Sequence, residues 1–544
     1  MKWRNRNKKI DWRWNEGLAL IAAKKRSSQD LEEQKIKQLS WGWRELSLMI
    51  MVGVVGGLLL AKVVYLQLVL GDDNFLLAKN NSVKLERLRA PRGILFDRNG
   101  QALTENVKDE RYGVNRKYPF GSELAHLVGY VSEVEKDEIG CYQGSCYQAG
   151  MLVGRFGAEK SFEAKLRGID GGEIWEEDVK GRKLRKLGEQ QPKKGEDINL
   201  SVDERLQQIA FSALEKKLGD KGKGSVVALD MQGKVLALVS YPSFDPNLFT
   251  ISKNVTELQR ILNDEENQYF LDRAIGGKYP PGSIFKLVTA YAGLEEGVIT
   301  EETKIEDVGE LRVGKYRYGN WYWDKYGKKD GLLNVVGALK RSNDIFFYKV
   351  GEKVGIKKLD EWAKKFGLGE RTGIELAGEA KGLVPTPLWK ERYVGEKWFL
   401  GNTYHLAIGQ GDLLVTPIQV ARMGVAAISG QLCQVSVLKD KPTNCSNLGL
   451  SSNNIELVRE GMKEACAPGG TAFPLFNFDP WLICKTGTAQ HGGKDDKPHA
   501  WILVGYPGEK PEMVLVVMLE SAGEGSAEAG VVAKEILEEW KLEK

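Results

Sequence analysis

One stretch of the chain, residues 46–70, restricts the possible folds more than any other. Its sequence, LSLMIMVGVVGGLLLAKVVYLQLVL, carries a single charge at Lys62. At 1.5 Å per residue, a helix of this length crosses the hydrocarbon core of a bilayer. A buried helix of a soluble domain is the alternative, but such helices rarely carry so continuous an apolar stretch. We therefore predict one transmembrane helix at residues 46–70.

The residues before this helix indicate the direction in which it crosses. Residues 1–44 contain 12 Lys or Arg and only five Asp or Glu. A basic flank is retained on the cytoplasmic side, so we expect a cytoplasmic tail at 1–45 and an external remainder. A cleaved signal peptide is the alternative. The long basic region, with no clear small-x-small cleavage site after it, argues against that alternative.

Composition and cysteine usage narrow the class of protein. The chain has 544 residues and a formal net charge of +4, which gives no case for a nucleic-acid partner. The absence of Cys-x-x-Cys and the presence of only four histidines argue against a zinc site. All six cysteines follow the apolar stretch, where disulfides can form. Proximity favours Cys141–Cys146 and Cys433–Cys445, although fifteen connectivities are possible.

The external part divides into two regions. Residues 71–220 are charged and broken by glycines, with short strand-like runs and no concentrated apolar helix, so we expect an extended modular domain. Within it, RGILFDRNG (92–100) predicts a tight Asn-Gly turn, and its Arg and Asp are interpreted as scaffold rather than catalyst.

Residues 221–544 predict a second, α+β domain. Strand patterns occur at 225–230, 234–240, 481–488, 499–505 and 513–520, and a last helix is predicted at 528–540. Two early and three late strands around a helical centre indicate a five-stranded antiparallel sheet flanked by helices.

The stretch 279–286 (YPPGSIFK) holds the candidate nucleophile. The proline and glycine residues before Ser283 cannot continue a helix, and the apolar run SIFKLVTAYAGL predicts a helix that begins at Ser283. Lys286 lies one turn further on the same face, within reach of the Ser283 hydroxyl proton. Backbone N–H groups at the helix start favour negative charge that develops there.

Ser-x-x-Lys alone is a weak signal, and the chain contains a second copy at Ser436 and Lys439. The flanks of that copy (QVSVLKD) alternate as in a strand, with no Pro-Gly helix start before it. We predict a structural role for it. The alternative interpretation of Ser283 is an ordinary helix N-cap.

Two further motifs lie in the same domain. Ser342, Asn343 and Asp344 separate a helical run from the apolar residues 345–347, and Lys485-Thr486-Gly487-Thr488 ends a predicted strand. A lysine, two hydroxyls and a glycine at a strand end suit a bound carboxylate and a substrate backbone lying close by.

The order Ser-x-x-Lys, Ser-x-Asn, Lys-Thr-Gly resembles the signature of penicillin-binding proteins and serine β-lactamases. RGILFDRNG is similar to the start of the pedestal, or dimerisation, domain of the class B transpeptidases, and LDMQGKVLALVSYPSFDPN to the entry of their transpeptidase domain. HLAIGQGDLLVTPIQVARM resembles the elongation-type proteins, penicillin-binding protein 2. The resemblance implies a cell-wall D,D-transpeptidase in the bacterial inner membrane, with a penicillin-binding domain at 221–544.

The resemblance also implies the residue roles. Ser283 attacks a peptidoglycan stem peptide, Lys286 is the general base, and Ser342 relays a proton to the leaving amine. Lys485, Thr486 and Thr488 hold the terminal carboxylate, with the substrate-binding residues Asn343 and Gly487 beside them. The backbone N–H groups of Ser283 and Thr488 form the oxyanion hole.

Two departures from the family pattern bear on this chemistry. Position 344 is Asp where the general motif has Asn, which alters the charge near Lys286. The zinc site of some members needs Gly-His-Gly after an Asp, and here KYGKKDG follows Asp324, so we expect no metal and no cofactor.

The implied partners are stem peptides, β-lactams as covalent inhibitors, a glycan polymerase of the shape, elongation, division and sporulation family, and elongation-complex scaffold proteins. A division-type transpeptidase, a non-catalytic β-lactam sensor or scaffold, and a β-lactamase or D,D-carboxypeptidase remain as alternatives. The long pedestal argues against the hydrolases, which have no need to hold a site far from the membrane.

Overall fold

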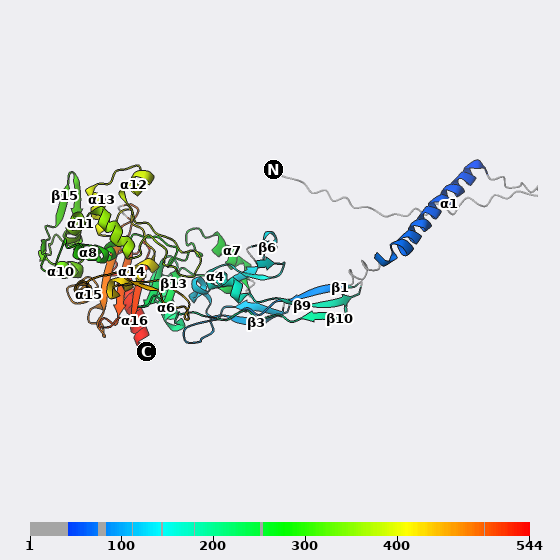
Figure 1. The fold of residues 1–544 in the computed structure, drawn as a ribbon, viewed down its shortest axis with the longest axis horizontal. Coiled ribbons are helices and arrows are strands. Elements are labelled where there is room, and N and C mark those ends of the chain that lie inside the picture. The colour runs from blue at the N-terminus through cyan, green and yellow to red at the C-terminus, as the bar shows by residue number, and fades with distance from the viewer. Residues whose placement is uncertain are drawn as a thin grey trace, which may run out of the picture. The chain divides into compact units, whose positions relative to one another are not determined.

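A computed structural model of the chain describes residues 42–73, 83–110, 113–142, 145–178, 180–250, 254–493 and 496–543 (Figure 1). The chain forms two units, residues 1–82 and 83–544, and each is described by itself.

The first unit contains the apolar helix. Helix α1 (Trp43–Val64) continues into a π-helical turn, Tyr65–Val69, and its apolar side chains are exposed. Among the described residues this is the one helix that is long and apolar enough to cross a membrane. The predicted bounds of 46–70 agree with it to within three residues.

The second unit is built on the predicted five-stranded antiparallel sheet, with strand order β13-β12-β22-β21-β20. The strands are β12 (Gly224–Asp230), β13 (Val235–Tyr241), β20 (Ile483–Ala489), β21 (His499–Tyr506) and β22 (Met513–Leu519). Successive side chains of a strand point to opposite faces, and here both faces are covered. Val227 and Val516 enter one hydrophobic core, and Ala228 and Val517 enter the other.

Helices cover both faces of this sheet. On one face lie α6 (Glu204–Leu218) and α16 (Ala529–Glu543), and Figure 1 shows α16 beside the sheet at the C-terminal end. The other face is covered by α8 (Lys286–Glu295), α11 (Asp344–Lys365) and α14 (Pro417–Ser429). The remaining helices of this region include α7 (Val255–Asn263), α9 (Trp321–Tyr326), α10 (Val335–Arg341), α12 (Pro387–Tyr393), α13 (Leu400–Ala407) and α15 (Ser452–Cys466).

Helix α6 corrects one expectation, because it lies in the region where no concentrated apolar helix was predicted. Asp203 caps its start by accepting a hydrogen bond from Leu206 N (3.3 Å). Its apolar residues recur at helical spacing and are buried against the sheet, but charged residues in its first and last turns dilute that pattern in the sequence.

The pedestal consists of short sheets and short helices. Its largest sheet has strand order β1-β9-β10, with β1 at Val83–Leu88, β9 at Gly171–Glu177 and β10 at Lys183–Gln190 (Figure 1). The smaller strands are β2 (Leu95–Phe96), β3 (Glu105–Asp109), β4 (Gly113–Lys117), β5 (Val131–Glu133), β6 (Gly140–Tyr142), β7 (Ser145–Tyr147), β8 (Leu152–Gly154) and β11 (Ile198–Asn199). Helices α3 (Ala125–Val128), α4 (Gly157–Ser161) and α5 (Glu163–Leu166) complete it. The predicted turn at 97–100 is present, since Gly100 N donates to Asp97 O (3.2 Å).

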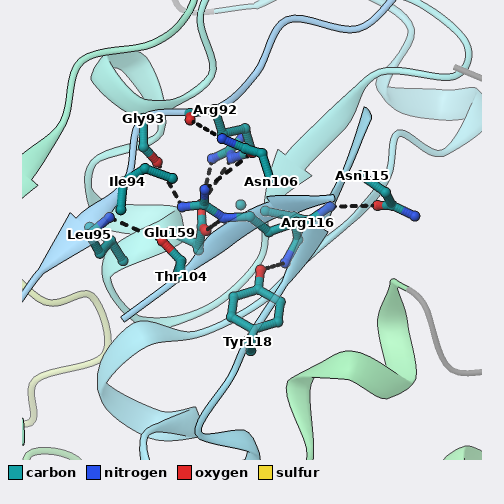
Figure 2. Close-up of polar contacts among 12 residues, drawn as sticks. Arg92, Gly93, Ile94, Leu95, Thr104, Asn106, Asn115, Arg116, Tyr118 and Glu159 are labelled. Carbon is teal, nitrogen blue, oxygen red and sulfur yellow. Dashed lines mark hydrogen bonds and ion pairs between the residues drawn. The ribbon is translucent and has the colours of Figure 1, made fainter. Parts of the chain in front are cut away.

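A buried ion cluster holds the pedestal together. Figure 2 shows Arg92 and Arg116 converging on Glu159: Arg92 donates to its Oε2 (2.7 Å) and Arg116 to its Oε1 (2.7 Å). Arg116 and Glu159 are fully buried. Burial raises the pKa of the Glu159 carboxyl, but Arg116 and Arg92 outweigh this and hold the pKa below its ordinary value. The arginine that opens RGILFDRNG is therefore scaffold, as expected.

We predict that Glu159→Gln loosens the pedestal by about 3–5 kcal/mol, because removing one partner leaves buried arginine charges uncompensated. Hydrogen exchange measured by mass spectrometry on peptides from residues 113–166 reports this opening locally. The matched control is Glu105→Gln, which breaks the exposed Glu105–Lys117 pair. That control is expected to change the opening free energy by less than about 1 kcal/mol. Equal exchange in both variants would contradict the importance of the cluster.

Candidate active site

Three separate elements bring the sequence motifs together. Ser283 lies in a 3-10 turn (Gly282–Phe285), Ser342 directly follows α10, and Lys485 lies on β20. The Lys286 amine donates to Ser342 O (2.7 Å), and the Lys485 amine donates to Ser342 Oγ (2.8 Å). Ser342 is thus the point at which the other two motifs meet.

The start of the helix that carries Lys286 differs from the sequence prediction. The α-helix begins at Lys286 rather than at Ser283, and the residues before it form the 3-10 turn. Gly282 has a φ of 56°, and a Cβ there would lie 2.8 Å from Thr488 O. A residue with this conformation and this close approach must be glycine. The tight turn therefore packs the Gly282 backbone, next to Ser283, against the end of β20.

Lys286 is fully buried, and its amine contacts the second motif. It donates to Asp344 Oδ1 (2.7 Å) and makes a longer contact with Ser342 Oγ (3.4 Å). Burial lowers the pKa of the Lys286 amine below its ordinary value, while Asp344 opposes this by raising it. The neutral amine needed of a general base is therefore favoured by burial and disfavoured by Asp344.

The second lysine, Lys485, is also fully buried. Burial, and after it the charge of Lys286, lowers the pKa of the Lys485 amine well below its ordinary value, with Asp344 acting in the opposite direction. The Ser342 hydroxyl lies between the two amines in a residue with a left-handed φ of 51°. A hydroxyl held between two such amines can pass a proton from one group to another.

Ser283 is half-buried, and within the described part of the chain its hydroxyl has no hydrogen-bond partner. No hydrogen bond joins the Ser283 hydroxyl to the Lys286 amine in this conformation, in which that amine donates to Ser342 O and Asp344 Oδ1. Catalytic hydrogen bonds often form only when substrate binds, so the shared turn still leaves the two side chains in the same site.

Asp344 is held from two further directions. Its Oδ2 accepts a hydrogen bond from Trp321 N (2.9 Å), and its backbone N donates to Asn320 Oδ1 (3.1 Å). The short helix α9 and the residue before it therefore fix the carboxylate that touches Lys286. Neither Asn320 nor Trp321 was singled out from the sequence, since neither belongs to a motif.

Asn343, predicted to contact substrate, makes hydrogen bonds to other protein groups in this structure. It is fully buried, and it caps α11 by accepting from Phe346 N (2.9 Å). Its amide donates to Asp307 Oδ2 (3.0 Å) and Asp330 Oδ2 (3.1 Å). All of its polar atoms are therefore occupied by protein, and a substrate contact would have to break these bonds.

The third motif lies along β20 at the edge of the sheet. The Thr486 hydroxyl donates to Thr471 Oγ1 (2.8 Å), and the half-buried Thr488 accepts from Gly525 N (3.1 Å). A Cβ at Gly487 would lie 2.8 Å from Pro281 O. The missing side chain therefore makes room for the turn before Ser283, in addition to the predicted room for a substrate backbone.

The Gly409-Gln410-Gly411 stretch contacts both the first and third motifs. Gly282 N donates to Gly409 O (2.9 Å), and Gln410 Nε2 donates to Thr488 O (3.1 Å). A Cβ at Gly409 would lie 2.1 Å from Gly282 O. The stretch used above only for its resemblance therefore supports the site directly.

Two disulfides join cysteines among the described residues. The Cys433–Cys445 disulfide is confirmed, and a second disulfide joins Cys466 at the end of α15 to Cys484, next to Lys485. Cys141 and Cys146 face each other in the β6–β7 register, but that pairing falls on residues whose side chains are not described.

Across the described ranges, no group of three His, Cys, Asp or Glu residues is placed to hold a metal ion. Ser436, the serine of the second Ser-x-x-Lys copy, lies outside the site, and its hydroxyl donates to Glu375 Oε1 (2.8 Å).

This arrangement is typical of a serine acyl-transfer site. It combines a serine on a tight turn at a helix start with a buried lysine three residues on, and a second lysine contacts the first through a serine hydroxyl. Two family models match the chain: the penicillin binding protein transpeptidase domain at residues 224–539, and the penicillin-binding protein dimerisation domain at 109–200. The chain belongs to the penicillin-binding proteins, and within them to the elongation-type transpeptidases.

Individual relatives agree with this placement. The peptidoglycan D,D-transpeptidase MrdA of Escherichia coli K12 is 35% identical over 78% of this chain and 71% of its own length. The first curated relatives are matched over 66–71% of their length. Penicillin-binding protein 2 of Helicobacter pylori, solved in complex with MreC, is 26% identical with a TM-score of 0.73 over 85% of this chain and 99% of that chain. A chain of a peptidoglycan synthase complex is 29% identical, with a TM-score of 0.74 over 91% and 98% of the two chains.

Proposed function

We propose that this protein is a serine-type peptidoglycan D,D-transpeptidase that cross-links stem peptides during cell elongation and binds penicillin covalently. The proposal rests on the position of the Ser342 hydroxyl. This hydroxyl accepts a hydrogen bond from Lys485 and lies 3.4 Å from the Lys286 amine. Lys286 in turn lies three residues after Ser283. These contacts link a candidate base to a candidate proton relay, and the half-buried Ser283 lies on the turn directly before the base.

In the proposed first half-reaction, Ser283 Oγ attacks the carbonyl carbon of the penultimate D-alanine while Lys286 takes the hydroxyl proton. The tetrahedral intermediate then collapses, the C–N bond breaks, and Ser342 passes a proton to the leaving D-alanine amine. In the second half-reaction an amine from a neighbouring strand attacks the acyl-enzyme and restores Ser283. A β-lactam follows the first half-reaction, but its leaving group stays attached, so Ser283 is trapped.

The third motif supplies the proposed substrate contacts. Lys485, Thr486 and Thr488 hold the terminal carboxylate of the donor peptide. The close packing of Gly282 on Thr488 supports an oxyanion hole made of the Ser283 and Thr488 backbone N–H groups. Asn343 is left out of the substrate contacts, because its side chain is fully engaged with the protein.

The experiment that tests this function measures two products from the purified full-length chain in detergent. With a stem pentapeptide donor and an acceptor amine, a transpeptidase releases D-alanine and forms the cross-linked peptide. D-alanine released without cross-linked product would indicate a D,D-carboxypeptidase. Penicillin bound without either product would indicate the sensor or scaffold alternative.

The proposed partners follow from the solved relatives. One relative is solved with MreC, and another within a synthase complex that couples polymerisation to cross-linking. We therefore propose that this chain works with a glycan polymerase of the shape, elongation, division and sporulation family and with an elongation scaffold. Depletion in the host is expected to round or widen the cells, as seen by microscopy. Long filaments with blocked septa would instead indicate a division role.

The proposed location is the bacterial inner membrane, with a cytoplasmic N-terminus and an external catalytic domain. The basic residues before the helix and its exposed apolar side chains support this. We propose a tail at 1–45, a membrane helix at 46–70, a pedestal from 71 and a transpeptidase domain to 544. Because α6 packs on the sheet, we move the boundary between the last two domains from 220 to about 203.

Asp344→Asn is expected to shift the pH dependence of penicillin acylation. The acid limb, where the rate rises with pH, should move to lower pH. Lys286 must be neutral to act as a base, and Asp344 raises the pKa of its amine from 2.7 Å away. Removing that charge lowers the pKa, so the neutral amine becomes available at lower pH. The measurement is the second-order acylation rate against pH for wild type and variant. An unmoved limb would mean that Asp344 only organises its neighbours.

A further inference from the structure

We propose that Asp307 is a positioning residue for this reaction, whose buried carboxylate holds the second motif so that Asp344 meets Lys286. The inference rests on the proposed acyl-transfer function. Asp307 lies just after β14 (Ile305–Glu306), far from all three motifs in the sequence, and none of the motif patterns includes it.

The Asp307 carboxylate collects four N–H donors. Its Oδ2 accepts from Asn320 Nδ2 (2.8 Å), Asn343 Nδ2 (3.0 Å) and Asp330 N (2.9 Å). Its Oδ1 accepts from Gly309 N (2.8 Å). The side chain is almost entirely buried, at 2% exposure, so these donors replace water completely. A carboxylate satisfied in this way is a rigid acceptor with a fixed direction.

Two of these donors lead directly to the proposed catalytic groups. Asn320 uses its other side-chain atom, Oδ1, to accept from Asp344 N (3.1 Å). The next residue, Trp321, donates its backbone N–H to Asp344 Oδ2 (2.9 Å). Asp307 therefore fixes the amide that holds the Asp344 backbone, and the chain segment that holds the Asp344 carboxylate.

The second route runs through Asn343, which lies between Ser342 and Asp344. Its amide is held by Asp307 and Asp330, and its carbonyl oxygen caps α11. Arg341 donates to Asp330 (2.8 Å) and so balances one of the two carboxylates. Ser342 has a left-handed backbone, which persists only where its neighbours are firmly held.

The geometry gives this network a measurable chemical consequence. The charged groups that face the Lys286 amine are Asp344 and Lys485. If the amides move when Asp307 is removed, Asp344 turns away from Lys286 and no longer raises the pKa of its amine. A loss of Asp307 should then act on the pH profile in the same direction as Asp344→Asn.

The test uses the full-length chain in detergent, a labelled penicillin, and active enzyme counted by adduct at saturation. Asp307→Ala is expected to slow acylation per active molecule by on the order of a hundredfold and to move the acid limb to lower pH. Asp307→Asn keeps one carbonyl acceptor for the three Oδ2 donors, so it should recover part of both effects. In an Asp344→Asn background, Asp307→Ala should move the limb no further.

The matched control is Glu379→Gln, which alters another buried carboxylate, one that accepts from Thr372 N and Oγ1 (both 2.6 Å). It should leave the limb where it is. If the Asp307 variants are slow but their limb is unmoved, the residue only stabilises the fold and the inference is wrong. If Asp307→Ala yields no active molecules, the inference is tested with Asp307→Asn alone, and an unmoved acid limb in that variant would overturn it. A wild-type chain that forms no adduct would instead overturn the proposed function itself.

Discussion

A Ser283→Ala variant is expected to take up no covalent penicillin, whereas the wild-type chain takes up a single adduct. The acyl bond forms on the Ser283 hydroxyl, and alanine offers no atom that could replace it. Because Ser283 is half-buried and its hydroxyl is hydrogen-bonded to no described residue, removing that hydroxyl should leave the fold intact. Intact-protein mass spectrometry followed by peptide mapping measures both the amount of the adduct and its position.

The chain offers its own control in Ser436. This serine has a lysine at the same spacing, but it is buried and its hydroxyl donates to Glu375 (2.8 Å). Ser436→Ala should therefore form the adduct at the wild-type level. An adduct that maps to Ser436, or that survives in Ser283→Ala, would overturn the assignment of the nucleophile.

The sheet could be predicted from sequence because its strands are short apolar runs bounded by turn residues. The run at 481–488 became β20 at Ile483–Ala489, and the run at 513–520 became β22 at Met513–Leu519. Helix α6 was missed because charged residues at both of its ends dilute its apolar pattern in the sequence. Packing against the sheet, rather than local composition, makes this segment a stable helix.

The site residues could be named from the sequence, and the resemblance placed Asp344 near Lys286, but most of their other hydrogen-bond partners could not be predicted. The three motifs select serines and lysines by order and spacing, and this information is local. The partner of the Lys286 amine is decided by competition among buried acceptors from distant segments. The sequence placed Lys286 within reach of Ser283, and in the structure its amine donates to Ser342 O and Asp344 Oδ1.

The same limit explains the supporting residues. Asn343 was assigned to substrate because it stands inside a motif, yet its amide faces Asp307, which is distant in sequence. Gln410 was noted only for resemblance, yet it holds the carbonyl of Thr488. Hydrogen bonds between segments far apart in the chain leave no periodic trace, so pattern reasoning cannot find them.

Lys286→Met is expected to slow penicillin acylation by on the order of a hundredfold to ten-thousandfold, the usual contribution of a positioned general base. Methionine fills the buried channel of the lysine stem but cannot accept a proton. The second-order rate constant with labelled penicillin measures the loss, and Lys439→Met provides the control. Lys439 is exposed and donates to Arg98 O (2.9 Å), so its replacement should leave acylation unchanged.

A second variant separates the missing base from a damaged site. Lys286→Met leaves Asp344 as a buried carboxylate without its cation, which by itself could distort the second motif. Lys286→Met combined with Asp344→Asn removes that lone charge while the base is still absent. The double variant should therefore stay as slow as Lys286→Met. Recovery of the wild-type rate would mean that the unpaired carboxylate caused the loss, and that Lys286 is not the group that takes the proton from Ser283.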